Sequence, residues 1–431
     1  MLDRYFKLTE NHTSVRQEFL GGLTTFMTMA YIVVVNPQIL AQAGMPPAGV
    51  LFATCLSAAV ASLVMGLYAN YPIAMAPGMS LNAYFTYAVC QGMHIPWQTA
   101  LGVVFLSGVL FVLLTVTRIR EHIVNGIPHC LKHSTAAGIG MFIAFVGLRN
   151  GGLVVASPAT LVTLGNFASP QVQVACFGLI LTLVLMTRKV PGAILLGILG
   201  TTLVGYARGI GHWPAALVAW PQASGTFLQL DLRGALHLSV LELIFAFLFV
   251  DLFDNVGTLV GVCEQAGFVK DGRIPRVGRA LLADGIGTMF GALTGTSTVT
   301  SYIESAAGVA AGARTGLSNV VVAGLFLVAM FFSPLAVGIP AAATAPAMIV
   351  VGALMTQSVS LIDWADFTEA FPAFISMVAM PLSFSIATGL SLGVIAFSVV
   401  KVAAGKYREV GILLWVLTAL FVLRYIYLAG T

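Results

Sequence analysis

Residues 71–85 read YPIAMAPGMSLNAYF, and residues 295–308 read GTSTVTSYIESAAG. Both stretches lie among apolar runs of membrane length, but prolines and glycine interrupt the first, while a Thr/Ser run and Glu304 interrupt the second. Irregular backbone at membrane depth persists only where protein or a polar cavity covers it. Two interrupted segments in the two halves of a membrane chain are the pattern expected at a transporter binding site.

The composition is that of a polytopic membrane protein. Of the 431 residues, 58% are hydrophobic and 8% are charged, whereas charged residues make up about 25% of a soluble protein. The five cysteines and seven histidines lack metal-ligand spacing, and no catalytic or nucleotide-binding motif is present. We therefore expect no enzyme, no metal and no cofactor. We also expect no nucleic-acid partner, because the basic residues sit in loops.

Apolar runs of span length predict fourteen membrane elements. They lie at 19–40, 49–68, 72–91, 97–117, 134–149, 170–187, 190–207, 240–262, 278–293, 297–313, 316–337, 343–361, 371–383 and 386–403. A further run, 411–429, is interrupted by Arg424, and it either lies in the membrane interface or forms a fifteenth span.

Basic residues orient these elements, because cytoplasmic loops carry an excess of Lys and Arg. The loops expected on one side of the membrane hold only Arg149, Arg208 and Arg233. The N-terminal segment and the loops expected on its side of the membrane hold Arg4, Lys7, Arg16, Arg118, Arg120, Lys132, Arg188, Lys189, Lys270, Arg273, Arg276, Arg279, Arg314, Lys401, Lys406 and Arg408. We expect a multi-pass protein of the plasma (inner) membrane with a cytoplasmic N-terminus.

Fourteen elements divide into two sets of seven, which pairs the third element (72–91) with the tenth (297–313), the two interrupted ones. Because each repeat has an odd number of elements, the second must insert with the opposite orientation. The expected fold is therefore an all-α polytopic membrane protein of fourteen transmembrane segments. These form 7+7 inverted repeats, in which elements three and ten are half-helix/extended segments.

Carboxylates occur in apolar context only in the second half of the chain. Asp251 and Asp254 are i,i+3 on one helix face, with Thr258 one turn further. Two close carboxylates in a low dielectric do not both ionise cheaply, which suits proton coupling. The alternative is that one aspartate bonds neighbouring groups and holds helices together.

Glu304 is the carboxylate expected to contact substrate directly. The alternative is a capping box, because Ser301 and Glu304 have the spacing of that motif, and both interpretations can hold together. Glu242 is interpreted as a solvated helix start, and Asp284 as a helix cap or dipole partner.

Element three carries small and polar residues suited to a binding site. Pro77 suits the first turn of a helix, Gly78 permits close approach of a ligand or a crossing backbone, and Asn82 can both donate and accept. The alternative is a packing glycine and an asparagine that joins helices. Thr28 in element one has the same two interpretations, substrate contact or helix packing.

Four stretches resemble the AzgA-like purine permeases of the nucleobase–cation symporter-2 group. They are GGLTTFMTMAYIVVVNPQIL (21–40), YPIAMAPGMSLNAYF (71–85), LFDNVGTLVG (252–261) and GTSTVTSYIESAAGVAAGARTGL (295–317). The family's usual APGMGLNAYF reads APGMSLNAYF here, with Ser80 in place of a glycine. The resemblance implies symport of purine bases (adenine and/or guanine and hypoxanthine) with protons, as a secondary active transporter.

The resemblance also assigns roles to single residues. By similarity, Asp254 and Glu304 take the places of the two carboxylates that hold the base, and both join Asp251 as candidates for proton coupling. Gly78, Met79 and Asn82 match the substrate face of element three, and Ile303 supplies backbone beside Glu304. Thr258 and Thr28 complete the expected substrate-binding set.

The resemblance further implies a core domain and a gate domain. The core comprises 1–133 (elements one to four) and 240–337 (elements eight to eleven). The gate comprises 134–239 (elements five to seven) and 338–431 (elements twelve to fourteen and the C-terminal run). The resemblance also implies a homodimer that forms through the gate. Alternatives are an anion permease or exchanger on the same architecture, or a channel. Small anions favour a cation or bare helix N-termini, whereas this chain offers carboxylates.

Overall fold

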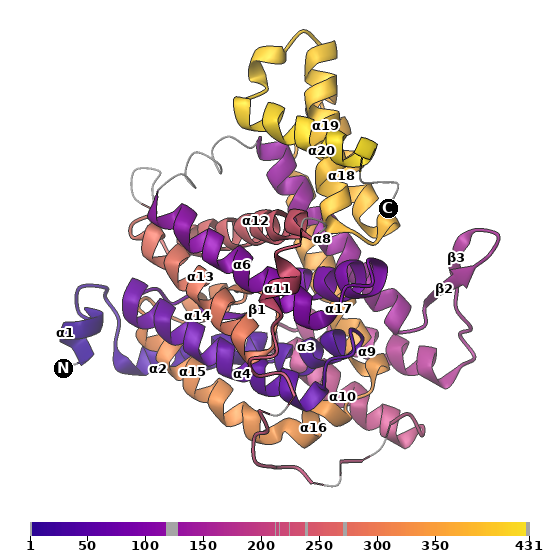
Figure 1. The fold of residues 1–431 in the computed structure, drawn as a ribbon. Helices are drawn as coiled ribbons and strands as arrows, with labels where there is room; N and C mark the ends of the chain where they lie inside the picture. The colour runs from indigo at the N-terminus through magenta and orange to yellow at the C-terminus, as the bar shows by residue number, and fades with distance from the viewer. Residues whose placement is uncertain are drawn as a thin grey trace. The chain divides into compact units, whose positions relative to one another are not determined.

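The computed structural model describes residues 2–117, 128–211, 213–214, 216–223, 225–237, 240–269 and 274–427. Four basic residues used for the orientation, Arg118, Arg120, Lys270 and Arg273, lie outside these ranges. The chain divides into two compact units: Met1–Val116 with Gly147–Met348, and Thr117–Val146 with Ile349–Thr431. Figure 1 shows the helices and strands of each unit.

The first unit contains most of the helices and all four described strands. Its helices are α1 (Leu2–Phe6), α2 (Val15–Met29), α3 (Ile32–Ala41), α4 (Pro47–Val64), η1 (Met65–Ala69), α5 (Met79–Ala83), η2 (Tyr84–Gly92), α6 (Trp97–Val116), α9 (Pro170–Thr187), α10 (Ala193–Ala207), α11 (Leu232–Ala235), α12 (Leu241–Gln265), α13 (Val277–Thr294), α14 (Ser305–Ala310), α15 (Leu317–Ala329), η3 (Met330–Phe332) and α16 (Ser333–Gly338). Its strands are β1 (Met75–Pro77), β2 (Val154–Ser157), β3 (Leu161–Leu164) and β4 (Val299–Ser301).

The second unit contains η4 (Thr356–Leu361), α18 (Phe367–Ser383), α19 (Ile386–Ala403), η5 (Tyr407–Glu409) and α20 (Ile412–Tyr427). Two helices, α8 (His129–Asn150) and α17 (Ala341–Met355), contribute residues to both units.

The predicted polytopic helical fold is confirmed. Within the described ranges, nine helices are long and apolar enough to cross a membrane, and three shorter apolar helices accompany them. Each of the fourteen predicted elements contains a helix, and only elements three and ten begin with a strand. Two details differ from expectation: element one is divided into α2 and α3, and the hairpin β2–β3 lies between elements five and six.

Strands β1 and β4 are the interrupted parts of elements three and ten, and they pair with each other. The pairing is antiparallel, with Ala76 opposite Thr300. Two more backbone bonds extend it symmetrically: the Gly78 N–H donates to the Thr298 carbonyl at 2.9 Å, and the Tyr302 N–H to the Ala74 carbonyl at 3.0 Å. An antiparallel pair has a local two-fold axis, so the two segments cross with the opposite orientations that inverted repeats require.

One hydroxyl from the preceding long helix holds each strand. Ser62 of α4 accepts from the Met75 N–H at 3.0 Å and donates to the Met75 carbonyl at 3.1 Å. Thr288 of α13 accepts from the Val299 N–H at 3.3 Å and donates to the Val299 carbonyl at 3.1 Å. Met75 and Val299 are the first residues of their strands. The same arrangement therefore satisfies buried strand backbone in both halves.

The helices around these strands pack closely. α15 contacts both α2 and α4, and α13 contacts α4 and α6, as the ribbon shows (Figure 1). A Cβ added at Gly316 would lie 1.9 Å from the Gly66 carbonyl oxygen, so only glycine permits this contact. Glu18 is fully buried and accepts from the backbone N–H groups of Arg314 at 2.8 Å and Thr315 at 3.1 Å. It thereby satisfies donors beside the start of α15.

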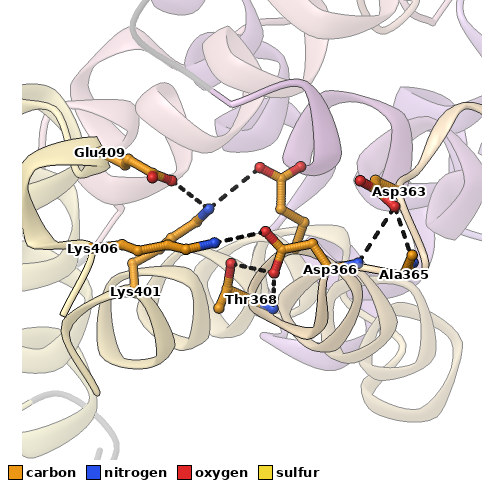
Figure 2. A network of polar contacts seen from close by, with 8 residues as sticks. Asp363, Ala365, Asp366, Thr368, Lys401, Lys406 and Glu409 are labelled. Atoms are coloured by element: carbon orange, nitrogen blue, oxygen red, sulfur yellow. Dashed lines mark hydrogen bonds and ion pairs between the residues drawn. The ribbon is translucent and has the colours of Figure 1, made fainter. Parts of the chain in front are cut away.

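In the second unit, α18 and α19 pack as a hairpin whose ends are tied by charges. The side chain of Lys401 is 1% exposed and pairs with Glu409 at 2.6 Å and with Glu369 at 3.4 Å. Lys406 pairs with Asp366 at 3.0 Å. Figure 2 shows the two lysines of this cluster reaching toward carboxylates.

Asp366 is the N-cap of α18, accepting from the Thr368 N–H at 2.8 Å and from the Thr368 hydroxyl at 2.7 Å (Figure 2). The bond from the Thr368 hydroxyl, then those from Lys406 and from the Thr368 N–H, hold the pKa of Asp366 well below its usual range. The carboxylate form is thus the one that caps the helix.

Candidate functional site

The carboxylate of Asp254 on α12 lies against the interrupted part of element three. Its Oδ2 accepts a hydrogen bond from the hydroxyl of Ser80 on α5 at 3.1 Å. A Cβ built on Gly78 would lie 3.8 Å from the same oxygen and 2.8 Å from Cγ2 of Thr300. Because Gly78 has no side chain, its backbone can lie close to both strand β4 and the Asp254 carboxylate. The predicted close approach of a crossing backbone is therefore present.

Glu304 lies where element ten passes from strand to helix, at the N-cap of α14. Its Oε1 accepts from the hydroxyl of Tyr31 at 2.6 Å, which is the distance of a hydroxyl donating to a carboxylate. Tyr31 is 1% exposed and lies at the junction between α2 and α3. Thr28 donates to the Thr25 carbonyl at 2.8 Å and approaches the Glu304 carbonyl at 3.4 Å, so it joins helix and site.

The capping-box interpretation of Glu304 is wrong. Its side chain caps no backbone N–H at the start of α14, and the Ser301 hydroxyl has no hydrogen-bond partner among the described residues. Ser301 instead belongs to strand β4, opposite Met75. The helix begins three residues later than the motif places it, at Ser305.

Two further expectations are corrected. Pro77 is not in the first helical turn but ends strand β1, and its carbonyl accepts from the Tyr302 hydroxyl at 2.5 Å. Asp284 does not cap α13, because that helix begins at Val277 and Asp284 is fully buried in its interior. Glu242, by contrast, lies in the first turn of α12, as expected.

The remaining predicted site residues lie on the same elements. Asn82 of α5 is fully buried and accepts from the Ser297 hydroxyl through Oδ1. Met79 begins α5 and is 6% exposed. Ile303 is half exposed, and its Cδ1 lies 3.4 Å from a Cβ built on Gly261 of α12.

Asp251 and Thr258 flank Asp254 along α12, one turn to either side. Asp251 is fully buried, and Thr258 is 9% exposed. The i,i+3 and i,i+4 spacings therefore place all three on one helical stripe. Helix α12 contacts α14, α5 and strand β4.

Buried polar atoms with no partner occur on the segments that carry or adjoin the two carboxylates. Among the described residues they include Asn82 Nδ2, both amide atoms of Asn255, and the hydroxyls of Thr298, Thr300 and Ser301. Buried polar groups are normally hydrogen-bonded, and leaving them without a partner is costly. This polar lining therefore has unused capacity to donate and accept, as expected where a polar ligand or water binds.

The electrostatic character of the site is acidic. The ion pairs of the described residues are Lys7–Glu10, Lys401–Glu369, Lys401–Glu409 and Lys406–Asp366, and none of them includes Asp254 or Glu304. Each of these two carboxylates is half-buried and receives one hydroxyl bond on one oxygen. The other oxygen of each is left to accept further donors.

Sequence reasoning did not predict the contacts of three residues: Tyr31, Ser80 as a partner of Asp254, and the buried Glu18. Their partners lie 273, 174 and about 300 residues away in sequence. The one signal available was local: a tyrosine hydroxyl and a serine hydroxyl within otherwise apolar elements must find partners.

Comparison with known sequences gives long and specific matches. The sequence model of the Permease family matches residues 16–392. A putative permease of Methanocaldococcus jannaschii is 54% identical over 100% of this chain and 99% of its own length. The adenine permease AdeP of Escherichia coli is 44% identical over 99% and 96%. The guanine/hypoxanthine permease PbuO of Bacillus subtilis is 46% identical over 97% and 99%.

Solved structures share the fold at low identity. The transmembrane domain of the cyanobacterial bicarbonate transporter BicA aligns with a TM-score of 0.65 at 16% identity, covering 86% of this chain and 97% of that one. A murine anion transporter of the solute carrier 26 family, in an inward-facing state, aligns with a TM-score of 0.62 at 12% identity, covering 90% and 68%. These likenesses show the architecture alone.

Proposed function

Because the chain belongs to the nucleobase–cation symporter-2 family of permeases, we propose that it carries purine nucleobases into the cell together with protons. It is a multi-pass membrane transporter, not an enzyme. The observation that carries the proposal is the pair of half-buried carboxylates, Asp254 and Glu304, beside the crossing of β1 and β4.

Purine bases suit this site chemically. They are planar and uncharged, with N–H donors along their edges, and a carboxylate accepts two roughly parallel N–H bonds, as it does from arginine. The unpartnered Asn82 Nδ2 and the hydroxyls of Thr298 and Thr300 supply donors for the ring acceptors of the base. Desolvating a polar edge is favourable only where such partners replace water.

We propose that Asp254, Asp251 and Glu304 couple transport to protons, because they are carboxylates on the helices and segments that form the site. Carrying one proton with a neutral base moves one charge, worth about 2.3 kcal/mol per 100 mV of membrane potential. By the tenfold-per-1.4 kcal/mol rule, that corresponds to roughly fifty-fold accumulation. We also propose that the protein lies in the plasma (inner) membrane, and the basic-loop pattern supports an N-terminus in the cytoplasm.

An anion permease is the alternative, because both structural neighbours carry anions by their names. The acidic site of this chain favours a neutral substrate with N–H donors instead. Uptake of radiolabelled adenine, guanine, hypoxanthine, uracil and sulfate, with and without a protonophore, decides between them. Accumulation of a purine that collapses with the protonophore is expected. Sulfate uptake would favour the anion permease. Purine uptake that depends on a sodium gradient would contradict the proposed proton coupling.

We further propose that a core domain (1–133 and 240–337) moves as a rigid body against a gate domain (134–239 and 338–431), with dimerisation through the gate. Gln38 of the core donates to the Ile339 carbonyl at 2.6 Å and accepts from the Thr344 hydroxyl, and both partners are gate residues. Cross-linking Gln38→Cys to Thr344→Cys should therefore stop transport while purified protein still binds the base. Transport at the normal rate in the cross-linked protein would refute the movement.

A further inference from the structure

Ser80 is the only described residue that hydrogen-bonds the Asp254 carboxylate. Its hydroxyl donates to Oδ2 at 3.1 Å, and its side chain is 2% exposed. It lies in the first turn of α5, two residues after Gly78, so it belongs to the segment that crosses strand β4. The contact joins element three to element eight across 174 residues of sequence.

We propose that Ser80 is a positioning residue for substrate, which fixes the plane of the Asp254 carboxylate toward the base. The proposal rests on the proposed purine transport and deepens it, because it says how the acidic residue is presented. Ser80 acts through Asp254, to whose carboxylate its hydroxyl donates.

The need for such a residue follows from the rotational freedom of aspartate. The terminal torsion of an aspartate side chain is broad, so an unheld carboxylate samples many planes. A base that offers two parallel N–H groups requires one plane, and holding it in advance lowers the cost of binding. One hydroxyl bond on Oδ2 uses one of about four acceptor positions of the carboxylate, which leaves Oδ1 and part of Oδ2 for the base.

An alanine at this position removes the hydroxyl bond to Asp254 and the constraint that it places on the carboxylate, with little change in volume.

The test is a comparison of Ser80→Ala with Ser80→Thr in the full-length transporter. Initial uptake rates of adenine, guanine and hypoxanthine are measured over a range of concentrations, and the amount of protein in the membrane is quantified. We expect Ser80→Ala to raise the apparent KM of the transported base about tenfold with Vmax retained, the effect of removing one partner of a charged group. Ser80→Thr keeps the hydroxyl and should restore the wild-type KM.

Ser107→Ala is the matched control. Ser107 on α6 is 1% exposed, and its hydroxyl has no partner among the described residues, so its removal should leave the KM unchanged. A Ser80→Ala protein with wild-type KM, or a Ser80→Thr protein with a KM as high as that of Ser80→Ala, would overturn the proposal. Wild-type protein that takes up none of the three purines would instead overturn the proposed function.

Discussion

Removing the hydroxyl of Tyr31 should weaken base binding only while Glu304 is present. The Tyr31 hydroxyl donates to Glu304 Oε1 at 2.6 Å, and Tyr31 is 1% exposed. Tyr31→Phe keeps the ring and its packing, so the variant isolates the hydrogen bond. Glu304→Gln keeps the shape of the acceptor but removes its charge.

The magnitude follows from the type of bond. A hydroxyl at this distance from a carboxylate makes a charge-assisted bond, and hydrogen bonds to charged groups contribute about 1.5–3 kcal/mol. If that bond orients Glu304 toward the base, Tyr31→Phe should weaken binding roughly 10- to 150-fold. Because the glutamine variant has already lost the charge, adding Tyr31→Phe to it should change binding by much less.

The assay is equilibrium binding of a radiolabelled purine to purified wild type, both single variants and the double variant. Binding requires no turnover, so variants that do not transport can still be compared. The difference between the effects of Tyr31→Phe in the two backgrounds gives the coupling of the pair. Tyr206→Phe is the control, since that hydroxyl donates to the Gly338 carbonyl at 2.9 Å, away from both carboxylates. Equal effects in the two backgrounds would refute the orienting role.

Three further outcomes follow from contacts outside the site. Gly316→Ala should lower the melting temperature of purified protein sharply, because its Cβ would lie 1.9 Å from a backbone oxygen. Glu369→Gln combined with Glu409→Gln should lower it more than Lys401→Met, because only the former leaves a buried ammonium unpaired. The pKa of Asp366 is lowered in the folded protein. Its contribution to folding stability should therefore be present above its ordinary pKa of 3.8 and be lost as the pH falls below that value. Between pH 7 and pH 3, the melting temperature of Asp366→Asn should therefore fall less than that of the wild type.

Sequence reasoning located the crossing segments because their physics is local. Proline and glycine within a membrane-length apolar run cannot form a continuous helix, so the breaks near Pro77 and Gly295 were visible without a structure. Carboxylates in apolar context carry the same kind of signal, since their burial must be compensated. Asp254 and Glu304 therefore stood out on composition and spacing alone.

The partners of those carboxylates were not visible, because they are set by tertiary packing. Nothing near Tyr31 or Ser80 in sequence distinguishes either hydroxyl from one that bonds its own helix. The capping-box error has the same origin. The backbone of Ser301 pairs with strand β1, so it is not available to begin a helix, and a long-range pairing overrides a four-residue motif.

On the proposed function, the charge at the crossing, more than the fold, selects the substrate class. Transporters of bicarbonate and of other anions share this architecture at 12–16% identity, so the backbone arrangement alone does not choose between anions and neutral bases. In this chain each half of the crossing is accompanied by one carboxylate with one hydroxyl donor, Asp254 with Ser80 and Glu304 with Tyr31. If the proposed function holds, an anion would meet two like charges there, whereas a base would meet carboxylate acceptors for its N–H groups. Asp254→Asn should therefore abolish purine accumulation, and intact accumulation in that variant, at wild-type protein levels in the membrane, would show that selectivity arises elsewhere.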